Sequence, residues 1–414
     1  MYYNNTSFFV VKIYIFVIIL TNLLVVYYME YSVQDVFNKF GDIYLDKYND
    51  GYSKLNVFNN IIACRTKKMG VNIYKCSDCG KQLYVYRSCM DRHCPNCLDY
   101  KKEVWIEKHK SDILDIKYYH IVLCIPKELY PLCYYNQEVM YDLLFKISSD
   151  VVIDCCYEYL GINVGITSIL HTWSQKGKYY PHIHMLVTGG GVNKVGKWED
   201  SELVNEEVIR TRFKNRIINL VKKLRLNFYG MFSYLNHYDY YIKHINNIDN
   251  DKFICYKKEP YNSVKDIYEY FAKYAFRVWI SNERIKNIDD KYVYFSYKDY
   301  DDKNKDKISK VKGEEFIRRF LTHTLTKNFV KIRYYGIMSC KNKSKKIDKL
   351  RILTKTKRIK DRLISKIELL KRILNKDINK CPKCNGKLVL YKEIKPNKGP
   401  PKVKNKDILV NLHS

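Results

Sequence analysis

Residues 180–188 read YPHIHMLVT and run into three glycines at positions 189–191. Apolar residues alternate along this stretch as they do in a β-strand, so His182 and His184 share one face while Ile183 points into the core. Two imidazoles side by side can bind one divalent metal ion and leave coordination positions open for a ligand. The stretch therefore predicts a strand that carries a metal-binding pair. The alternative is an ordinary strand with two partly buried histidines.

The segments on either side of this strand alternate between strand and helix patterns. Residues 118–125 are predicted to form a buried strand that Pro126 ends, residues 138–156 an amphipathic helix, and residues 164–174 a second strand. This order is typical of an antiparallel α+β domain with helices on one face. Helical patterns also cover residues 31–62, 105–114, 202–224, 267–278 and 313–325.

The chain is strongly basic. Its 414 residues include 74 Lys and Arg against 44 Asp and Glu, which gives a net charge of +30. Such a field suits a polyanionic partner, with nucleic acid ahead of an anionic membrane surface. From Lys341 to Lys380 basic residues outnumber acidic ones several-fold on a helical pattern, which fits either a DNA-binding arm or a solvated helix.

Two CxxC pairs near the amino terminus predict a structural zinc site. Cys76 and Cys79 precede a short β-like segment, and Cys94 and Cys97 follow it, as in a four-cysteine zinc ribbon. With all four tetrahedral positions filled by protein, this Zn²⁺ would be structural rather than catalytic. Three further residues crowd the same region, and the sequence leaves open whether they replace a ligand or form a second site: Cys64, Cys89 and His93.

The other cysteines are less informative. The chain has 14, and CxxC pairs in a long basic chain favour reduced thiols and a cytoplasmic setting over disulfides. Cys381 and Cys384 form a lone pair that cannot close a tetrahedral site, so Cys340 or His413 would have to help. The sequence leaves the role of this pair open.

The first 28 residues form an apolar leader. Such a stretch could be a signal anchor or a short transmembrane helix, but it lacks the flanking charges that orient one. An ordinary amphipathic sequence begins at Met29, so we expect the true start there and no membrane partner.

A helical pattern at residues 267–278 carries the second piece of chemistry. Tyr270 and Tyr274 are four residues apart and share one edge of the apolar stripe with Arg277, whereas Tyr268 falls far round the helix. The alternative is a pair of amphipathic tyrosines at a core margin. A phenol, with its pKa of about 10, attacks a phosphodiester only if the developing charge is stabilised. A divalent cation on His182 and His184 could do this.

With these residues the chain resembles the HUH endonucleases, and in particular the two-tyrosine rolling-circle transposases of insertion sequences that carry an amino-terminal zinc-binding domain. The resemblance covers roughly residues 31 to 340, and one departure is Tyr180, where a histidine is expected before Pro181. It rests on the motifs CRT at 64–66, RHCP at 92–95, LHTW at 170–173, PHIH at 181–184, YFAKY at 270–274, FIRRF at 316–320 and RYYG at 333–336.

The resemblance implies an RRM-like nuclease core and single-stranded DNA transfer through a 5′-phosphotyrosine and a free 3′-hydroxyl. Tyr270 and Tyr274 become the nucleophiles, and His182 and His184 the ligands of Mg²⁺ or Mn²⁺. Gln175 and His171 are both candidates for the third ligand, and we favour Gln175. The residues expected to contact DNA are Arg277, Arg318, Arg319, Lys331 and Arg333.

These patterns divide the chain into five segments. After the leader, residues 29–112 are predicted to form the helical lead-in and zinc-binding domain, and residues 113–290 the nuclease domain with its tyrosine helix. Residues 291–340 complete the transposase domain, and residues 341–414 form a basic helical arm and a tail. Single-stranded DNA is the expected partner, with no small-molecule substrate. The alternatives are a non-enzymatic zinc-ribbon DNA-binding regulator and a related relaxase or replication initiator.

Overall fold

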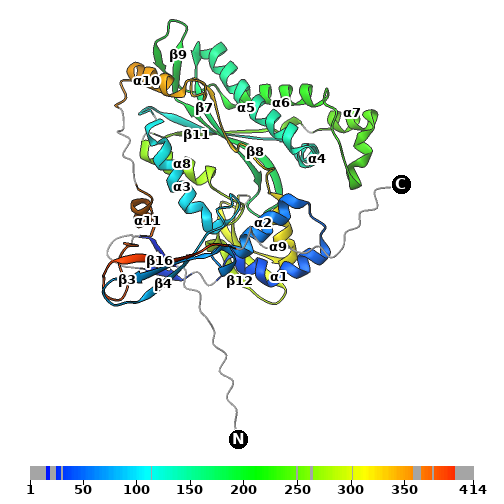
Figure 1. Cartoon of the computed structure of the whole chain (residues 1–414). Coiled ribbons are helices and arrows are strands. Elements are labelled where there is room, and N and C mark those ends of the chain that lie inside the picture. The colour runs from blue at the N-terminus through cyan, green and yellow to red at the C-terminus, as the bar shows by residue number, and fades with distance from the viewer. Residues whose placement is uncertain are drawn as a thin grey trace. The chain divides into compact units, whose positions relative to one another are not determined.

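The computed structural model describes residues 15–18, 25–28, 31–112, 114–248, 250–261, 264–300, 302–357, 365–374 and 377–396 (Figure 1). Its contacts divide the chain into two compact units. The cysteine unit combines Met1–Cys97, Ile280–Arg318 and Ser365–Ser414, and the histidine unit combines Leu98–Trp279 and Arg319–Ile364. The sequence predicts a row of successive segments, whereas each unit is assembled from separated ones.

A five-stranded antiparallel sheet forms the centre of the histidine unit. Its strands, in spatial order, are β11 (Ile254–Tyr261), β5 (Tyr118–Cys124), β8 (Tyr179–Thr188), β7 (Gly165–Trp173) and β15 (Ile332–Gly336). The stretch with the two histidines is β8, the middle strand. His182 lies opposite His171 of β7, and His184 lies opposite Val122 of β5.

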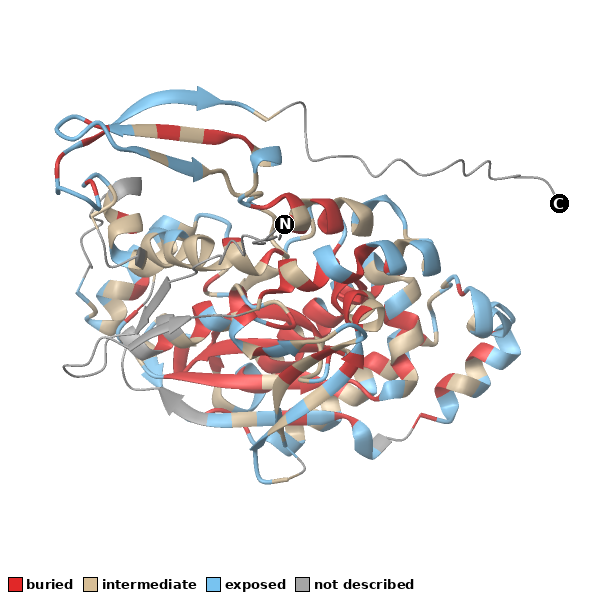
Figure 2. Ribbon diagram, turned by 90° about the horizontal axis from the view of Figure 1, so that it is seen from below, coloured by how far each residue is buried: buried red, intermediate tan, exposed pale blue. Residues whose placement is uncertain are grey.

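The two faces of this sheet are covered by different helices. Ile183 and Met185 belong to a large core cluster with residues of α5 (Gln137–Leu160) and α6 (Glu206–Val221). On the opposite face, Leu186 and Ile169 cluster with Ile267, Phe271 and Ala275 of α8 (Val264–Ala275). Figure 2 shows the central strands as largely buried. The predicted antiparallel α+β fold is confirmed, but helices cover both faces of the sheet and not one, because α8 lies over the face that carries the histidines.

Smaller elements complete the histidine unit. The hairpin strands β9 (Gly190–Asn193) and β10 (Trp198–Asp200) pair with each other, and β9 also pairs with β6 (Ile162–Asn163). The remaining helices of this unit are α3 (Pro95–His109, which begins in the cysteine unit), α4 (Tyr130–Tyr135), α7 (Tyr238–Asn246) and α10 (Lys343–Thr354).

The cysteine unit has a helical part and two three-stranded sheets. Helix α1 (Val33–Lys47) begins at Ser32, whose hydroxyl oxygen accepts from the Asp35 amide in a capping box. It packs through Phe37 on Phe58 of α2 (Tyr52–Ala63), with ring centroids 5.3 Å apart. One sheet has the order β12 (Ile285–Ile288), β13 (Tyr292–Asp299), β14 (Lys305–Lys312), and α9 (Gly313–Thr322) follows it.

The other sheet of the cysteine unit joins distant parts of the chain. Its order is β16 (Leu388–Ile394), β3 (Val71–Cys76), β4 (Gln82–Tyr86), so the strand nearest the carboxyl terminus pairs with one near the amino terminus. Helix α11 (Lys366–Leu374) precedes β16.

The apolar leader lies outside the described residues except for β1 (Ile15–Ile18) and β2 (Val25–Tyr28), which pair antiparallel. Among the described residues, the helices are all too short or too polar to span a lipid bilayer.

Candidate active site and metal centres

Three histidines converge on the face of the five-stranded sheet that α8 covers. His182 and His184 come from β8 and His171 from the neighbouring β7, and the nearest ring nitrogens of the three lie within 4.8 Å of one another. The Nε2 atoms of His182 and His184 are 3.0 Å apart. All three side chains are buried, with exposed fractions of 3% for His171, 8% for His182 and 7% for His184. The predicted pair is therefore part of a three-histidine cluster.

Burial keeps these imidazoles in the neutral form that binds metal. Removal from water lowers the pKa of His182 to about 4. Burial also holds the pKa of His171 and of His184 well below the usual range, and the positive charges of Lys331 and Arg277 add to this effect at His171. A neutral ring offers one nitrogen lone pair, as a divalent ion requires.

Backbone carbonyls determine which nitrogen is free in two of the three rings. His182 Nδ1 lies 2.7 Å from the Tyr180 carbonyl oxygen, and His171 Nε2 lies 2.7 Å from the Tyr274 carbonyl oxygen. Because a carbonyl only accepts, these nitrogens carry the protons, which leaves His182 Nε2 and His171 Nδ1 with lone pairs. An outer hydrogen bond of this kind fixes the tautomer of metal-binding histidines, so the cluster fits a divalent ion.

Helix α8 places both predicted tyrosines against the cluster. The hydroxyl groups of Tyr270 and Tyr274 are 3.0 Å apart. The Tyr274 ring lies with its centroid 4.6 Å from that of His184. The buried side of the helix, with Ile267 and Phe271 on the sheet, holds this orientation. The Tyr268 side chain lies outside the described residues.

A fourth histidine, which the sequence analysis missed, links the histidine cluster to Tyr270. His120 of β5 lies with Nε2 2.9 Å from His184 Nδ1 and Nδ1 3.1 Å from the Tyr270 hydroxyl. Burial, with Lys258 nearby, lowers its pKa to about 4. The only available signal was its alternate position in the 118–125 strand. The register that sets this strand beside β8 is not readable from the sequence.

His171, the other candidate for the third ligand, joins His182 and His184 in the cluster, and Gln175 stays a prediction. Gln175 follows the end of β7, and its backbone carbonyl accepts from Trp279 Nε1 at 3.3 Å. The turn between β7 and β8 needs Gly177, with φ of +73°, because a Cβ there would lie 2.2 Å from the Trp279 ring.

The five predicted DNA-contacting residues differ in their partners. Arg277 is exposed at the end of the tyrosine helix, and Lys331 donates to its carbonyl oxygen at 2.9 Å. Arg319 donates to the Lys176 carbonyl oxygen at 3.1 Å. Two others are held by carboxylates. Arg318 pairs with Glu315 at 2.6 Å, and Arg333 pairs with Asp142 and stacks over the Phe145 ring.

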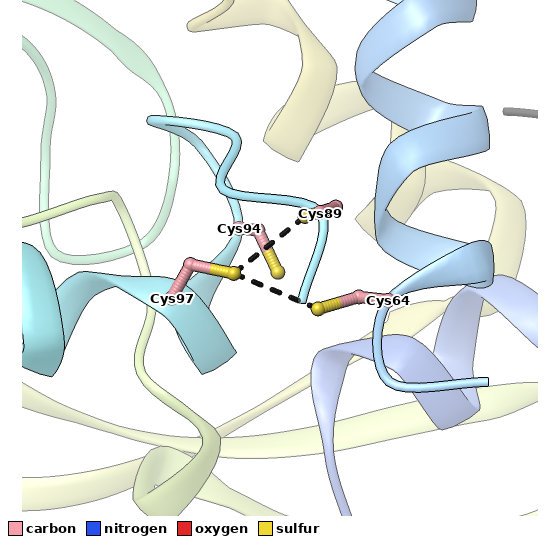
Figure 3. Close-up of side chains that lie close together, drawn as sticks. All are labelled: Cys64, Cys89, Cys94 and Cys97. Carbon is pink, nitrogen blue, oxygen red and sulfur yellow. Dashed lines mark hydrogen bonds between the residues drawn. The ribbon is translucent and has the colours of Figure 1, made fainter. Parts of the chain in front are cut away.

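Four cysteines of the cysteine unit point toward one centre, as Figure 3 shows: Cys64, Cys89, Cys94 and Cys97. The Cys97 sulfur is 3.6 Å from that of Cys64 and 3.6 Å from that of Cys89. Four thiolates around a tetrahedral zinc ion, each about 2.3 Å from it, would be separated by about 3.8 Å. The cluster fits zinc. His93 stays outside it, because its Nδ1 lies 3.0 Å from an Asp91 oxygen.

The predicted pairing of Cys76 and Cys79 with Cys94 and Cys97 is not the one in the structure. Cys76 and Cys79 instead meet Cys381 and Cys384, the lone pair near the other end of the chain. Local spacing suggested the wrong partners because two clusters interleave along the sequence.

Two protein families together match most of the chain. Residues 36–125 match the family described as "Transposase zinc-binding domain", of the IS91 type, and residues 165–346 match the family described as "Putative transposase", named for two tyrosines. The first match includes the four cysteines of Figure 3, and the second includes β7, β8 and α8. No solved structure matches the chain significantly.

Two curated relatives agree with these families. "Putative transposase y4qJ" of Sinorhizobium fredii is 27% identical over 394 residues, which are 90% of this chain and 97% of the relative. "Transposase for insertion sequence element IS801" of Pseudomonas savastanoi pv. phaseolicola is 30% identical over 162 residues, which are 39% of each chain. The chain belongs to the transposase family in which an IS91-type zinc-binding domain precedes a two-tyrosine transposase domain.

Proposed function

We propose that this transposase nicks and rejoins single-stranded DNA at insertion-sequence ends through a 5′-phosphotyrosine, as in rolling-circle transposition. One observation carries the proposal: the Tyr274 ring contacts His184 of the three-histidine cluster, and the Tyr270 hydroxyl is hydrogen-bonded to Tyr274 and to His120 beside that cluster. A non-enzymatic zinc-ribbon regulator would need neither group. The cytoplasm is the expected site of action.

The proposed ligands are His171, His182 and His184, which converge in the structure. These residues would hold a Mg²⁺ or Mn²⁺ ion, whose positive charge would bind the scissile phosphate and offset the charge on the attacking oxygen. The carbonyls of Tyr180 and Tyr274 orient two of the rings, so each presents the same nitrogen at every turnover.

Each tyrosine then performs one strand transfer. The phenol oxygen forms a bond to phosphorus, and the bond between phosphorus and the 3′ oxygen breaks. The phenol loses one proton and the leaving 3′ oxygen gains one, so the step is balanced. The phosphotyrosine keeps the bond energy, so a later 3′-hydroxyl can rejoin the strand without ATP. With hydroxyls 3.0 Å apart, the two tyrosines can serve successive transfers at one phosphate site.

The two tyrosines have different surroundings. Tyr270 is hydrogen-bonded to His120, whereas Tyr274 contacts His184 through its ring. If His184 binds metal through Nε2, its Nδ1–H donates to His120 Nε2, and His120 Nδ1–H then donates to the Tyr270 oxygen. His120 is thus a positioning residue that aims Tyr270 and stabilises negative charge on its oxygen.

A covalent-adduct assay tests the proposal. The full-length protein is incubated with single-stranded oligonucleotides from its element's ends and Mg²⁺ or Mn²⁺, and the adduct is separated by denaturing electrophoresis. The Tyr270→Phe/Tyr274→Phe variant should form no adduct while still binding DNA, because Phe keeps the packing. Each single variant should retain one transfer step. Tyr229→Phe, at a tyrosine with 64% exposure, is the matched control and should behave as the unaltered protein. A metal-dependent adduct in the double variant would place the nucleophile elsewhere.

A further inference from the structure

The second cysteine cluster consists of two turns that share one local geometry. Residues 76–81 read CSDCGK, and residues 381–386 read CPKCNG. In each turn, the amide of the first cysteine donates to the carbonyl five residues later, at 2.9 Å from Cys76 to Lys81 and 2.8 Å from Cys381 to Gly386. The amide after the second cysteine donates back to the first cysteine's carbonyl in both turns. Both turns therefore present two sulfurs in the same way.

The residue after the second cysteine has the same unusual backbone in both turns. Gly80 has φ of +69° and Asn385 has φ of +58°, which is the left-handed region. Glycine and asparagine are the residues that adopt it most readily. In the second turn the Lys383 amide also points at the Cys381 sulfur, 3.4 Å away, and such a donor stabilises a thiolate. Both sequences are suited to the same tight turn.

The sulfurs of the two turns face one another at the spacing of a metal site. Cys76 Sγ is 3.5 Å from Cys384 Sγ, and Cys79 Sγ is 3.7 Å from Cys381 Sγ. All four sulfurs lie within 4.8 Å of one another. A disulfide would need about 2.0 Å. Thiolates around a tetrahedral zinc ion would be about 3.8 Å apart, as at the first cluster.

The apolar cluster beside these cysteines is small. The buried members of its core are Cys76, Cys381 and Leu388, with Tyr74 and Leu83 partly buried beside them. So small a core rarely holds a fold unless a metal ion or disulfides strengthen it. The approach of the two turns is nevertheless close, because a Cβ on Gly386 would lie 2.9 Å from Cys76 Sγ.

We propose that Cys76, Cys79, Cys381 and Cys384 bind a second structural zinc ion, which fastens the carboxyl-terminal strand β16 to β3. Cys381 and Cys384 lie outside both family matches, which end at residues 125 and 346. The two cysteine pairs are 302 residues apart from Cys79 to Cys381, and the whole histidine unit lies between them in sequence. This zinc clasp (the four cysteines and their ion) is independent of the chemistry proposed for the tyrosines.

Zinc counting on the full-length protein tests the clasp. After gel filtration, elemental analysis should find two zinc ions per chain. The Cys381→Ser/Cys384→Ser variant should keep one, held by the first cluster, and Cys340→Ser should keep two, because Cys340 is exposed and outside both clusters. Two ions in the double variant, or one ion in both it and the unaltered protein, would overturn the proposal.

A gentler variant separates zinc loss from failed folding. Gly386→Ala places a methyl group against the Asp78 carboxylate and Cys76 Sγ, so it should speed the release of one of the two ions to a chelator at least several-fold. Gly51→Ala, where a Cβ meets nothing within 4 Å, is the matched control and should release zinc as the unaltered protein does. Hydrogen exchange should show faster exchange at β16 amides in the double variant while α5 stays protected. Equal release rates for the two glycine variants, with β16 unaffected, would refute the clasp.

Discussion

His120 Nε2 lies 2.9 Å from His184 Nδ1, so a histidine of β5 connects a proposed metal ligand to the hydroxyl of Tyr270. No equivalent bond to His120 is made by the Tyr274 hydroxyl among the described contacts, where its partner is Tyr270. This difference makes the two tyrosines separable by experiment.

Removing the His120 ring should impair Tyr270 more than Tyr274. In a Tyr274→Phe background, His120→Ala should slow adduct formation by roughly 10- to 100-fold, the usual effect of losing a partner that orients a ligand or nucleophile. In a Tyr270→Phe background the same change should have a smaller effect. His120→Gln should recover part of the rate, since an amide both accepts and donates. Equal losses in the two backgrounds would show that His120 only supports the fold.

The third metal ligand can be identified by measuring Mn²⁺ affinity without DNA. His171→Ala should weaken Mn²⁺ binding by at least about tenfold, because it removes one of three nitrogens that converge. Gln175→Ala is the informative control, and it should change the affinity little. The reverse pattern would identify Gln175 as the ligand.

The buried histidines should make the histidine unit acid-sensitive. The pKa values of His120 and His182 fall from 6.5 to about 4 on folding, so between these values the unfolded chain binds more protons. Stability is full above about pH 6.5 and is lost as the pH falls toward 4. The chain's 4 tryptophans, at positions 105, 173, 198 and 279, all lie in this unit, so their fluorescence during urea denaturation reports its unfolding.

His120→Gln supplies the control for this pH dependence. It removes one proton-binding group and leaves thiol protonation in the cysteine unit unchanged, so the loss of stability between pH 7 and pH 5 should be smaller than in the unaltered protein. An identical pH dependence in the two proteins would mean that His120 does not titrate in this way.

Basic residues around the site should differ in their effect on DNA binding. Arg277→Ala should weaken binding to single-stranded DNA and reduce the salt slope by about 1, as expected for a lost phosphate contact. Arg333→Ala should leave the slope unchanged and lower the stability, because Arg333 pairs with Asp142 and covers Phe145. Titrations at several salt concentrations distinguish the two outcomes, and a reduced slope for Arg333→Ala would reverse the assignment.

Sequence patterns predicted what depends on local periodicity. The alternation around His182 and His184 defines a strand face, and the spacing of Tyr270 and Tyr274 defines a helix edge, so both pairs could be recognised before the fold was known. The tyrosine helix and the middle strand occur where these patterns place them.

Long-range pairing could not be read in the same way. His120 reaches the site only because β5 lies beside β8 in one register, and a shift of one residue would turn its side chain to the other face. The three cysteine pairs share the CxxC spacing, so spacing alone cannot say which two share a metal. Proximity along the chain favoured Cys94 and Cys97, but the β16–β3 ladder brings Cys381 and Cys384 instead.

The pairing of β16 with β3 also bears on the order of synthesis. A ribosome adds about 5 to 20 residues per second, so the 302 positions between Cys79 and Cys381 take roughly 15 to 60 s to translate. Throughout that time the edge of β3 that pairs with β16 has no partner strand. The thiols of Cys76 and Cys79 likewise have no second cysteine pair to meet. A chain cut short before residue 381 contains every residue of the histidine cluster and both tyrosines, yet it cannot complete this sheet. Only a chain that includes β16 can form this sheet, so the presence of the sheet distinguishes full-length chains from nascent or truncated ones.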